Sequence, residues 1–275
     1  MKTINEKEQK RIMLEMLKFL DDICRKNGIK YSLIGGSLIG AIRHHGYIPW
    51  DDDIDIILTK NNYTKLKKIL DSETGRYQTL KYGEGGECFS FIKLIDTYTQ
   101  AREGVHGKLY PKYGIYMDIF CYYPTSNNYN ERKRQFSKIR ILVSLFARRK
   151  IDVKNRTFIQ NVERIGKNIV SRLMGYKRIK NTMEKTVNKY NGSKYVVSNW
   201  PVYSFEKEIQ LQKNIKDYID VIFEGTKVMI FKNYDEILRT SFGDYMTLPP
   251  KSERVSRHSL KMWWREGYED GEKHR

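Results

Sequence analysis

The chain has 275 residues, of which 40% are hydrophobic and 31% charged, and its formal net charge is +18 at pH 7. This composition allows a packed core and excludes a wholly disordered chain, and the length suits one large domain or two small ones. No apolar run approaches about 18 residues and the N-terminus is polar, so the sequence predicts neither a transmembrane helix nor a secretory signal. Cys24, Cys88 and Cys121 are too widely spaced for a disulfide framework or a zinc pattern, so we expect a cytoplasmic protein with reduced, buried cysteines.

The first 126 residues alternate between helical and strand patterns. Apolar spacing and β-branched runs predict these elements in chain order: a helix over 6–26, a strand over 29–34, a short helix capped by Ser37 and ending near His44, a strand over 53–58, a helix from Thr59 or Asn61 to Leu70, a strand pair over 77–82 and 88–98, and a strand over 115–122. This order predicts an α/β fold with a mixed sheet and flanking helices.

The composition changes near residue 127. Residues 131–190 contain eighteen Lys or Arg against four Asp or Glu, a local balance of +14, with helical apolar spacing and no proline. We expect a basic helical insertion over 127–192, between a catalytic core over 1–126 and a part over 193–275 that completes the catalytic domain. The basic face is either solvated, or meets an anionic membrane surface, or binds an acidic polymer. We find no nucleic-acid-binding module and predict no nucleic-acid partner.

The last third returns to mixed character. Residues 221–231 predict a hairpin around Glu224-Gly225-Thr226, and residues 234–240 predict a helix. Leu248-Pro249-Pro250 ends regular structure, and the charged tail after Trp264 is expected to fray.

The segment Asp53-Ile54-Asp55-Ile56-Ile57-Leu58 carries the strongest chemical signal. On a strand, Asp53 and Asp55 share one face, and two carboxylates at about 4 Å repel by roughly 4 kcal/mol at an effective dielectric of about 20. A divalent cation removes this repulsion, and Mg²⁺ or Mn²⁺ suits carboxylate oxygens. The alternative is a solvated acidic turn before a strand.

A phosphate-binding turn is predicted just before this strand. Gly35 and Gly36 let the backbone approach a phosphate, and Ser37 adds a hydroxyl donor at a helix N-terminus, although a plain tight turn is the alternative. Asp118 is the best third carboxylate, because it is the only acid in the apolar stretch 115–122, and Asp96 is the second choice.

Such a trio would hold two metal ions and support in-line displacement at phosphorus, with Asp118 helping to remove the proton of the incoming hydroxyl. Arg43 and Lys93 could neutralise phosphate charge, or they could be structural. His44 and the neighbouring His45 could ligate metal, act as a base or have a structural role, and His258 has no assigned place. Asp51 and His44 are the candidates for residues that contact and orient the metal-binding carboxylates without binding the metal themselves.

A family resemblance rests on the stretch GGSLIGAIRHHGYIPWDDDIDII, residues 35–57. It resembles the signature of the LicD-type phosphotransferases, which include fukutin and fukutin-related protein. The ordered matches continue with Phe91-Ile92-Lys93-Leu94, Tyr116-Met117-Asp118-Ile119-Phe120, Phe223-Glu224-Gly225, Asn233-Tyr234-Asp235-Glu236, Gly243-Asp244-Tyr245-Met246 and Leu248-Pro249-Pro250.

The resemblance implies a nucleotidyltransferase-like fold that transfers a phosphorylated alcohol from a CDP-linked donor to a cell-surface glycan. Phosphocholine from CDP-choline, moved to teichoic acid, capsule or lipopolysaccharide sugars, is the expected case, and ribitol or glycerol are alternative headgroups. In this resemblance Asp53, Asp55 and Asp118 are the metal-binding carboxylates, and the turn at 35–37 meets the nucleotide phosphate. Transfer of the nucleotide itself, or a non-catalytic module that docks on membrane or polyanion, are the rival hypotheses. The acceptor is expected to be a glycan or lipid-linked glycan, with the protein peripheral on the inner face of the cell membrane.

Overall fold

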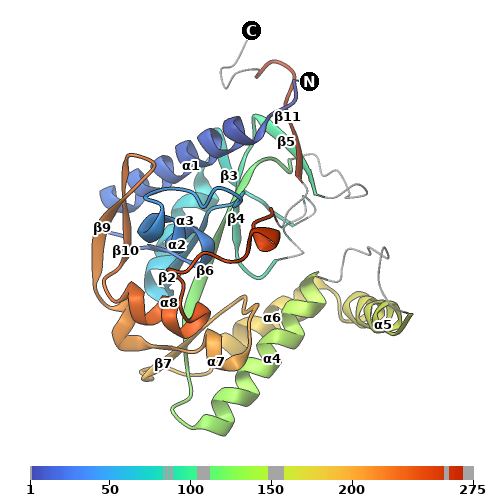
Figure 1. Ribbon diagram of the computed structural model, residues 1–275. Helices are drawn as coiled ribbons and strands as arrows, with labels where there is room; N and C mark the ends of the chain where they lie inside the picture. Colours follow the sequence, from blue (N-terminus) through green and yellow to red (C-terminus); the bar gives the residue numbers. More distant parts are fainter. Residues whose placement is uncertain are drawn as a thin grey trace.

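The computed structural model describes residues 2–82, 84, 86, 89–103, 112–147, 158–256 and 260–268. Within these ranges it is a mixed α/β structure with eight α-helices and a curled sheet (Figure 1). The predicted α/β class with a nucleotidyltransferase-like mixed sheet and flanking helices is therefore confirmed. None of the helices in these ranges combines the length and the hydrophobicity that are needed to cross a bilayer.

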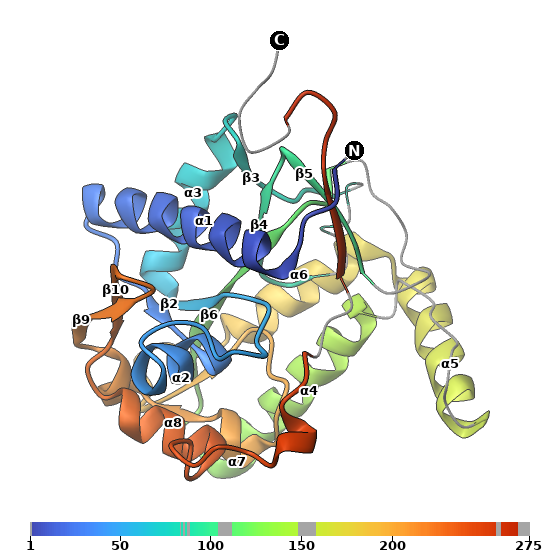
Figure 2. The ribbon, with the colours of Figure 1, turned by 45° about the horizontal axis from the view of Figure 1, so that its top comes forward.

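Helix α1 (Glu6–Lys26) lies across the sheet, where Figures 1 and 2 both show it. The side chain of Asn5 caps the helix by accepting a hydrogen bond from the Glu8 amide at 2.9 Å. One face of the helix is buried in the main core, as the apolar spacing predicted; its buried apolar residues are Ile12, Met13, Met16, Leu17, Leu20 and Cys24.

The main sheet has the strand order β1-β2-β6-β4-β3, with β7 pairing beside β6 and β8 beside β7. Its strands are β1 (Ser32–Leu33), β2 (Asp55–Thr59), β3 (Tyr77–Thr79), β4 (Ile92–Asp96), β6 (Tyr116–Thr125), β7 (Tyr195–Ser198) and β8 (Gln210–Leu211). The pair β2–β6 is parallel, and the other pairs are antiparallel. The helices α2 (Gly35–Arg43) and α3 (Lys60–Ser72) flank β2 in sequence.

Several predicted boundaries need correction. The strands predicted over 77–82 and 88–98 are limited to Tyr77–Thr79 and Ile92–Asp96, and three more corrections lie nearer the glycine turn. The strand predicted over 29–34 is limited to Ser32–Leu33, and the strand predicted from Asp53 begins only at Asp55. The short helix begins at Gly35 with Ile34 at its N-cap and no side-chain cap, so Ser37 is not the capping residue. The physical reason is that the Ser37 hydroxyl is used elsewhere: it accepts a hydrogen bond from the Asp55 amide at 2.9 Å.

The basic segment is helical where it is described: α4 (Tyr129–Ala147), α5 (Phe158–Met174) and α6 (Tyr176–Val187). Buried residues of α4 and α6 form a second apolar cluster with Val197 and Phe205, separate from the main core. The division into 1–126, 127–192 and 193–275 stays a prediction.

The C-terminal part contains two further strand pairs. The hairpin of β9 (Tyr218–Phe223) and β10 (Thr226–Phe231) confirms the predicted turn, and it is followed by α8 (Tyr234–Phe242). Strand β11 (Leu260–Trp264) pairs with β5 (Thr99–Glu103), a pairing that the sequence did not predict. A short helix, α7 (Phe205–Glu208), precedes the hairpin. Cys24 and Cys121 are buried as expected, whereas Cys88, His258 and most of the tail after Trp264 lie outside the described residues.

Candidate active site

The register of three neighbouring strands assembles the candidate site. Asp55 on β2 is paired with Asp118 on β6, and Asp118 is paired on its other side with Lys93 on β4. Neighbouring strands lie about 4.8 Å apart and paired residues point to the same face, so these three side chains form a row across the sheet. Residues that are far apart in the sequence are thereby brought together, as the sequence predicted for Asp55 and Asp118.

Lys93 is the immediate partner of Asp118. Its ammonium group donates to Asp118 Oδ1 at 2.6 Å, and its side chain is almost fully buried while that of Asp118 keeps 17% of its exposure. The ammonium group also lies 3.3 Å from the ring centroid of Tyr116 and 4.6 Å from that of Phe89. These contacts stabilise a positive charge beside the carboxylates.

The carboxylates before β2 lie close together. One oxygen each from Asp51, Asp52 and Asp53 falls within 4.8 Å of the others, and the described residues contain no second such group of three His, Cys, Asp or Glu side chains. The predicted trio of Asp53, Asp55 and Asp118 is thus less tightly gathered than the three consecutive aspartates. The reason is that Asp53 precedes the strand, so its position follows from the loop and not from strand alternation.

The charges in this region act on Asp55, which is half-buried. Burial, then the negative charges of Asp53 and Asp118, raise the pKa of Asp55 well above its usual range, and the charge of Lys93 opposes the increase. Asp52 is held by the Ser256 hydroxyl, which donates to its Oδ2 at 2.6 Å. The site therefore concentrates negative charge that an added cation would relieve.

The glycine turn is in direct contact with these acids. A Cβ on Gly36 would lie 2.2 Å from Asp51 Oδ2, and Gly35 has a φ of +61° with its Cβ position 4.0 Å from Asp55 Oδ2. Any side chain at position 36 would require the Asp51 carboxylate to move. The turn predicted to meet a phosphate lies beside the candidate metal ligands.

Arg43 and His44 lie at the C-terminal end of α2 and contact residues other than these acids. Arg43 Nη1 donates to the carbonyl of Tyr245 at 2.5 Å and to that of Thr247 at 3.3 Å, while the His44 ring lies edge-on to Trp50. Burial, then the charge of Arg254, lowers the pKa of Arg43. Burial, then the charge of Arg43, lowers the pKa of His44.

Sequence reasoning missed Arg254. Its guanidinium group lies 5.6 Å from the Trp50 ring centroid, and its Nε donates to the carbonyl of Pro249. Within the described residues no salt bridge joins Arg43 or Arg254 to an acid. Two guanidinium groups on one side of an acidic site favour a ligand that carries phosphate charge.

Asp96, the second choice for a third carboxylate, is not part of the site. It is fully buried and its carboxylate is bound by the Arg76 guanidinium, with Nη2 to Oδ2 at 2.7 Å. Asp96 is the last residue of β4, the strand that carries Lys93. Its ion pair with Arg76 indicates a structural role.

An aromatic group that the sequence did not single out lies next to Asp118. Phe120 follows Asp118 by two positions on β6 and is therefore on the same face. Its ring centroid lies 4.6 Å from that of Phe91, which in turn lies 4.9 Å from that of Trp200. All three are half-buried. The signal that could have revealed it is the alternation of Phe89, Phe91 and Lys93.

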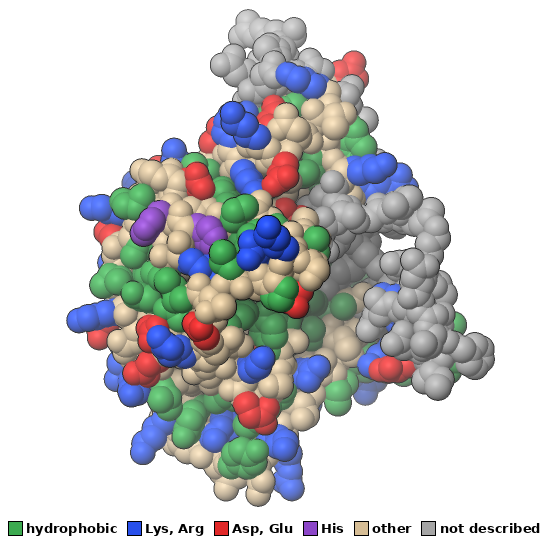
Figure 3. Space-filling model, in the orientation of Figure 1, with side chains coloured by type: hydrophobic (Ala, Val, Ile, Leu, Met, Phe, Trp, Pro, Cys, Tyr) green, Lys and Arg blue, Asp and Glu red, His purple; other side chains and the backbone are tan. Residues whose placement is uncertain are grey.

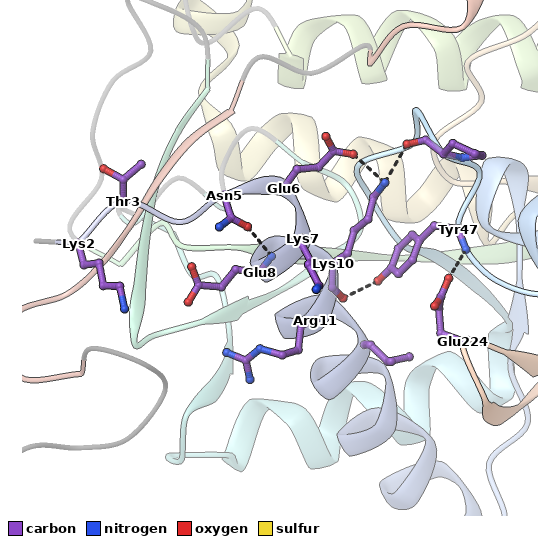
Figure 4. A pocket seen from close by; sticks show the side chains of 12 residues that line it. Lys2, Thr3, Asn5, Glu6, Lys7, Glu8, Lys10, Arg11, Tyr47 and Glu224 are labelled. Atoms are coloured by element: carbon purple, nitrogen blue, oxygen red, sulfur yellow. Dashed lines mark hydrogen bonds and ion pairs between the residues drawn. The ribbon is translucent and has the colours of Figure 1, made fainter.

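The face of the molecule in Figure 3 has a hollow in which hydrophobic side chains lie. A separate cavity of about 1110 Å³ lies over the start of α1 and is not the candidate site. In that cavity Glu224 accepts a hydrogen bond from the Tyr47 amide, and Lys10 bonds to Glu6 (Figure 4). None of the predicted site residues lines it.

A mixed sheet with acidic side chains on adjacent central strands, next to a Gly-Gly helix start, defines a nucleotidyltransferase-like enzyme fold. Residues 28–143 match the family model described as the nucleotidyltransferase domain of LicD, FKTN and FKRP. The chain is thus similar to this family over residues 28–143, in agreement with the resemblance found in the sequence.

Individual relatives extend the match. The lipopolysaccharide cholinephosphotransferase LicD of Haemophilus influenzae is 29% identical over 280 aligned positions, which cover 94% of this chain and 97% of the relative. The ribitol 5-phosphate transferase FKRP of mouse and that of human are each 32% identical over 65 positions, 24% of this chain and 13% of theirs.

Proposed function

We propose that this protein transfers a phosphorylated alcohol from a CDP-linked donor to a hydroxyl group of a cell-surface glycan such as teichoic acid, capsule or lipopolysaccharide. The name of the relative that aligns over 94% of the chain supports phosphocholine as the transferred group. CDP-choline as the donor is part of our proposal. The structural observation that carries the proposal is the row of Asp55, Asp118 and Lys93 beside the Gly35–Gly36 turn.

We propose that Asp53, Asp55 and Asp118 hold Mg²⁺ or Mn²⁺, with Asp51 behind them. Carboxylate oxygens are the donors that these hard cations prefer. The negative charges of Asp53 and Asp118, which add to the effect of burial on the pKa of Asp55, would be offset by a cation. When bound, the cation would supply charge stabilisation for the transferred phosphoryl group and the leaving phosphate.

The chain's own residues have defined tasks in this reaction. The acceptor oxygen forms a bond to the phosphorus that carries the alcohol, the bond to the bridging oxygen breaks, and CMP leaves. We assign to Asp118, whose Oδ1 accepts a hydrogen bond from Lys93, the task of helping to remove the proton of the acceptor hydroxyl. The Ser37 Oγ accepts from the Asp55 amide, so its own proton can be donated to a phosphate oxygen.

The aromatic group of Phe91, Phe120 and Trp200 supports a quaternary ammonium headgroup. It lies two residues along the same strand face from Asp118, roughly 7 Å at the rise of a β-strand. Aromatic faces attract a trimethylammonium group electrostatically, whereas they offer no hydrogen bonds to ribitol or glycerol. This arrangement favours choline among the three headgroups.

The deciding assay incubates the full chain with Mg²⁺, CDP-choline and a glycan acceptor, and then identifies the attached fragment by mass spectrometry. We expect phosphocholine on the glycan and free CMP. Attachment of CMP would instead establish nucleotidyl transfer, which the fold also supports. Absence of Mg²⁺-dependent binding of every CDP-linked compound would favour the non-catalytic binding module.

Two variants test the metal ligands. Asp53→Asn and Asp55→Asn should each abolish transfer while leaving the circular dichroism spectrum unchanged, because they remove charge at constant volume. Asp71→Asn is the matched control, since Asp71 is exposed on α3 and pairs with Lys67. A wild-type rate in either of the first two variants would reject the assignment.

We extend the proposal to a cytoplasmic location with peripheral contact between residues 131–190 and an anionic membrane. The local charge of +14 supports this contact, since basic clusters are attracted to anionic lipid headgroups.

A further inference from the structure

Helix α5 packs its polar side against the rest of the chain and exposes its apolar side. An amphipathic helix of a water-soluble protein normally turns its apolar stripe inward. In α5 the buried positions are instead polar: Asn168 is 4% exposed, and Ser171 is fully buried with its hydroxyl donating to the Leu145 carbonyl of α4 at 2.9 Å. The side of α5 that packs on the rest of the chain is therefore hydrophilic.

The apolar stripe of α5 is on the outside. Val162, Ile165, Ile169 and Leu173 follow one another at spacings of three or four and lie on one face of the helix. They are about half exposed, and Leu173 is 81% exposed. Figures 1 and 2 both show α5 at the periphery, projecting away from the sheet beyond α4 and α6. A contiguous apolar face on a projecting helix marks an interaction surface.

The charges around the stripe select its partner. Exposed Arg172 lies beside the last residue of the stripe, Leu173. Exposed Lys177, Arg178 and Lys180 follow it and line a cavity of about 980 Å³ with Met174 and Lys185. A second copy of the chain would bring a second +14 segment against the first, which is repulsive. A surface with an apolar interior and anionic headgroups satisfies both the stripe and the cations.

We propose that the outward face of α5 inserts into the acyl boundary of an anionic lipid bilayer, with the basic residues 172–180 on the lipid headgroups. This inference takes from the proposed function only that the partner is an anionic membrane. It adds the insertion of an apolar helix face to the electrostatic attraction. The phosphotransfer chemistry does not enter it, so the two can fail independently.

The test uses the full chain and vesicles of phosphatidylcholine with about 30% phosphatidylglycerol, measured by co-sedimentation. We expect binding that weakens with added salt and is absent on pure phosphatidylcholine vesicles. The double variant Ile169→Gln with Leu173→Gln should bind at least about tenfold more weakly, because each change removes an apolar contact with the acyl region. These exposed side chains are not needed for folding, so thermal unfolding should be unchanged.

The matched control is Ile222→Gln, an equally exposed residue on β9 at the opposite side of the molecule in Figure 1, which should bind as the wild type does. Transfer to a soluble glycan fragment should be equal in all three proteins. Equal vesicle binding by the double variant, or no binding by the wild type, would overturn the proposal. A concentration-dependent dimer in sedimentation velocity that the double variant abolishes would also overturn it, because a second copy would then cover α5.

Discussion

At the scale of single residues, the candidate site depends on close approach between backbone and carboxylate. Gly36, in the first turn of α2, lies so close to the Asp51 carboxylate that a methyl group there would require this carboxylate to move. The glycine pair thus has a role in addition to the predicted phosphate contact, because it leaves room for the Asp51 carboxylate.

We predict that Gly36→Ala lowers the free energy of unfolding by about 1–3 kcal/mol and lowers transfer at least tenfold, because the new methyl group displaces Asp51. Urea denaturation and the transfer assay measure the two effects. Gly75→Ala is the control, since a Cβ there meets no atom within 4 Å and should change stability by about 0.5 kcal/mol or less. If Gly36→Ala changes stability and transfer no more than Gly75→Ala does, the prediction that a methyl group at position 36 displaces Asp51 is wrong.

The aromatic group makes a prediction about donor choice. Trp200→Leu should lower kcat/KM for CDP-choline by roughly tenfold, as expected for loss of a cation–π contact of about 1–2 kcal/mol, and should alter the rate with CDP-glycerol little. Trp263→Leu on β11 removes an indole outside this group and should spare both donors. An equal loss with both donors would assign Trp200 to packing instead of headgroup recognition.

At the scale of elements, two strands share one edge of β6. Strand β4 pairs with the first half of β6 and β7 with the second half, so Phe91 and Trp200 meet where the two strands come together. The buried side chain of Asn199 joins them: its Oδ1 accepts from the Cys121 amide and its Nδ2 donates to the Ser90 carbonyl. The junction places the aromatic group beside Asp118.

Asn199→Ala should therefore cost about 2–3 kcal/mol of unfolding free energy, because it leaves the buried amide of Cys121 and the partly buried carbonyl of Ser90 without this partner. Asn188→Ala, at the exposed end of α6, is the comparison and should cost less than about 1 kcal/mol. Chemical denaturation measures both. Similar losses in the two variants would contradict the role of Asn199 at this junction.

At the scale of the whole molecule, the main core joins α1 to the centre of the sheet. Cys24 on α1 and Cys121 on β6 are both fully buried in the same apolar cluster, although nearly 100 residues separate them. Burial, then the charge of Asp21, raises the pKa of the Cys24 thiol to about 12, and burial raises the pKa of the Cys121 thiol as well. Their reactivity reports the integrity of the whole core.

We predict that iodoacetamide at pH 8 leaves Cys24 and Cys121 unmodified in the folded protein and modifies both in one urea transition. The thiolate fraction of Cys24 at pH 8 is about one in 10⁴ in the folded state, compared with about a tenth in the unfolded state. Because the unfolded state loses the proton first, these thiols also lower stability as pH rises above about 9. Peptide mass spectrometry follows each cysteine, and two separate transitions would contradict a single core.

Much of the fold could be predicted because it is encoded locally. The apolar spacing of residues 6–26 matches α1 at both ends, and the Glu224-Gly225 turn forms the expected hairpin. The boundaries around Asp53 and Ser37 could not be predicted, since the hydrogen bond between Ser37 and the Asp55 amide decides where the helix and the strand begin. The pairing of β5 with β11 joins segments that are far apart in the sequence, and the hydrophobic periodicity within one segment cannot predict such a pairing.

The sequence by itself determined the family likeness, the α/β class, the basic segment and the acidic residues next to a glycine turn, because spacing along a chain sets which neighbours share a face. Only the tertiary structure decided that Asp118 lies between Asp55 and Lys93 and that Asp96 forms an ion pair with Arg76. It also decided that α5 exposes its apolar side. These outcomes depend on strand register and on the orientation of packed helices. Long-range contacts set both, and the pattern within one segment leaves them open.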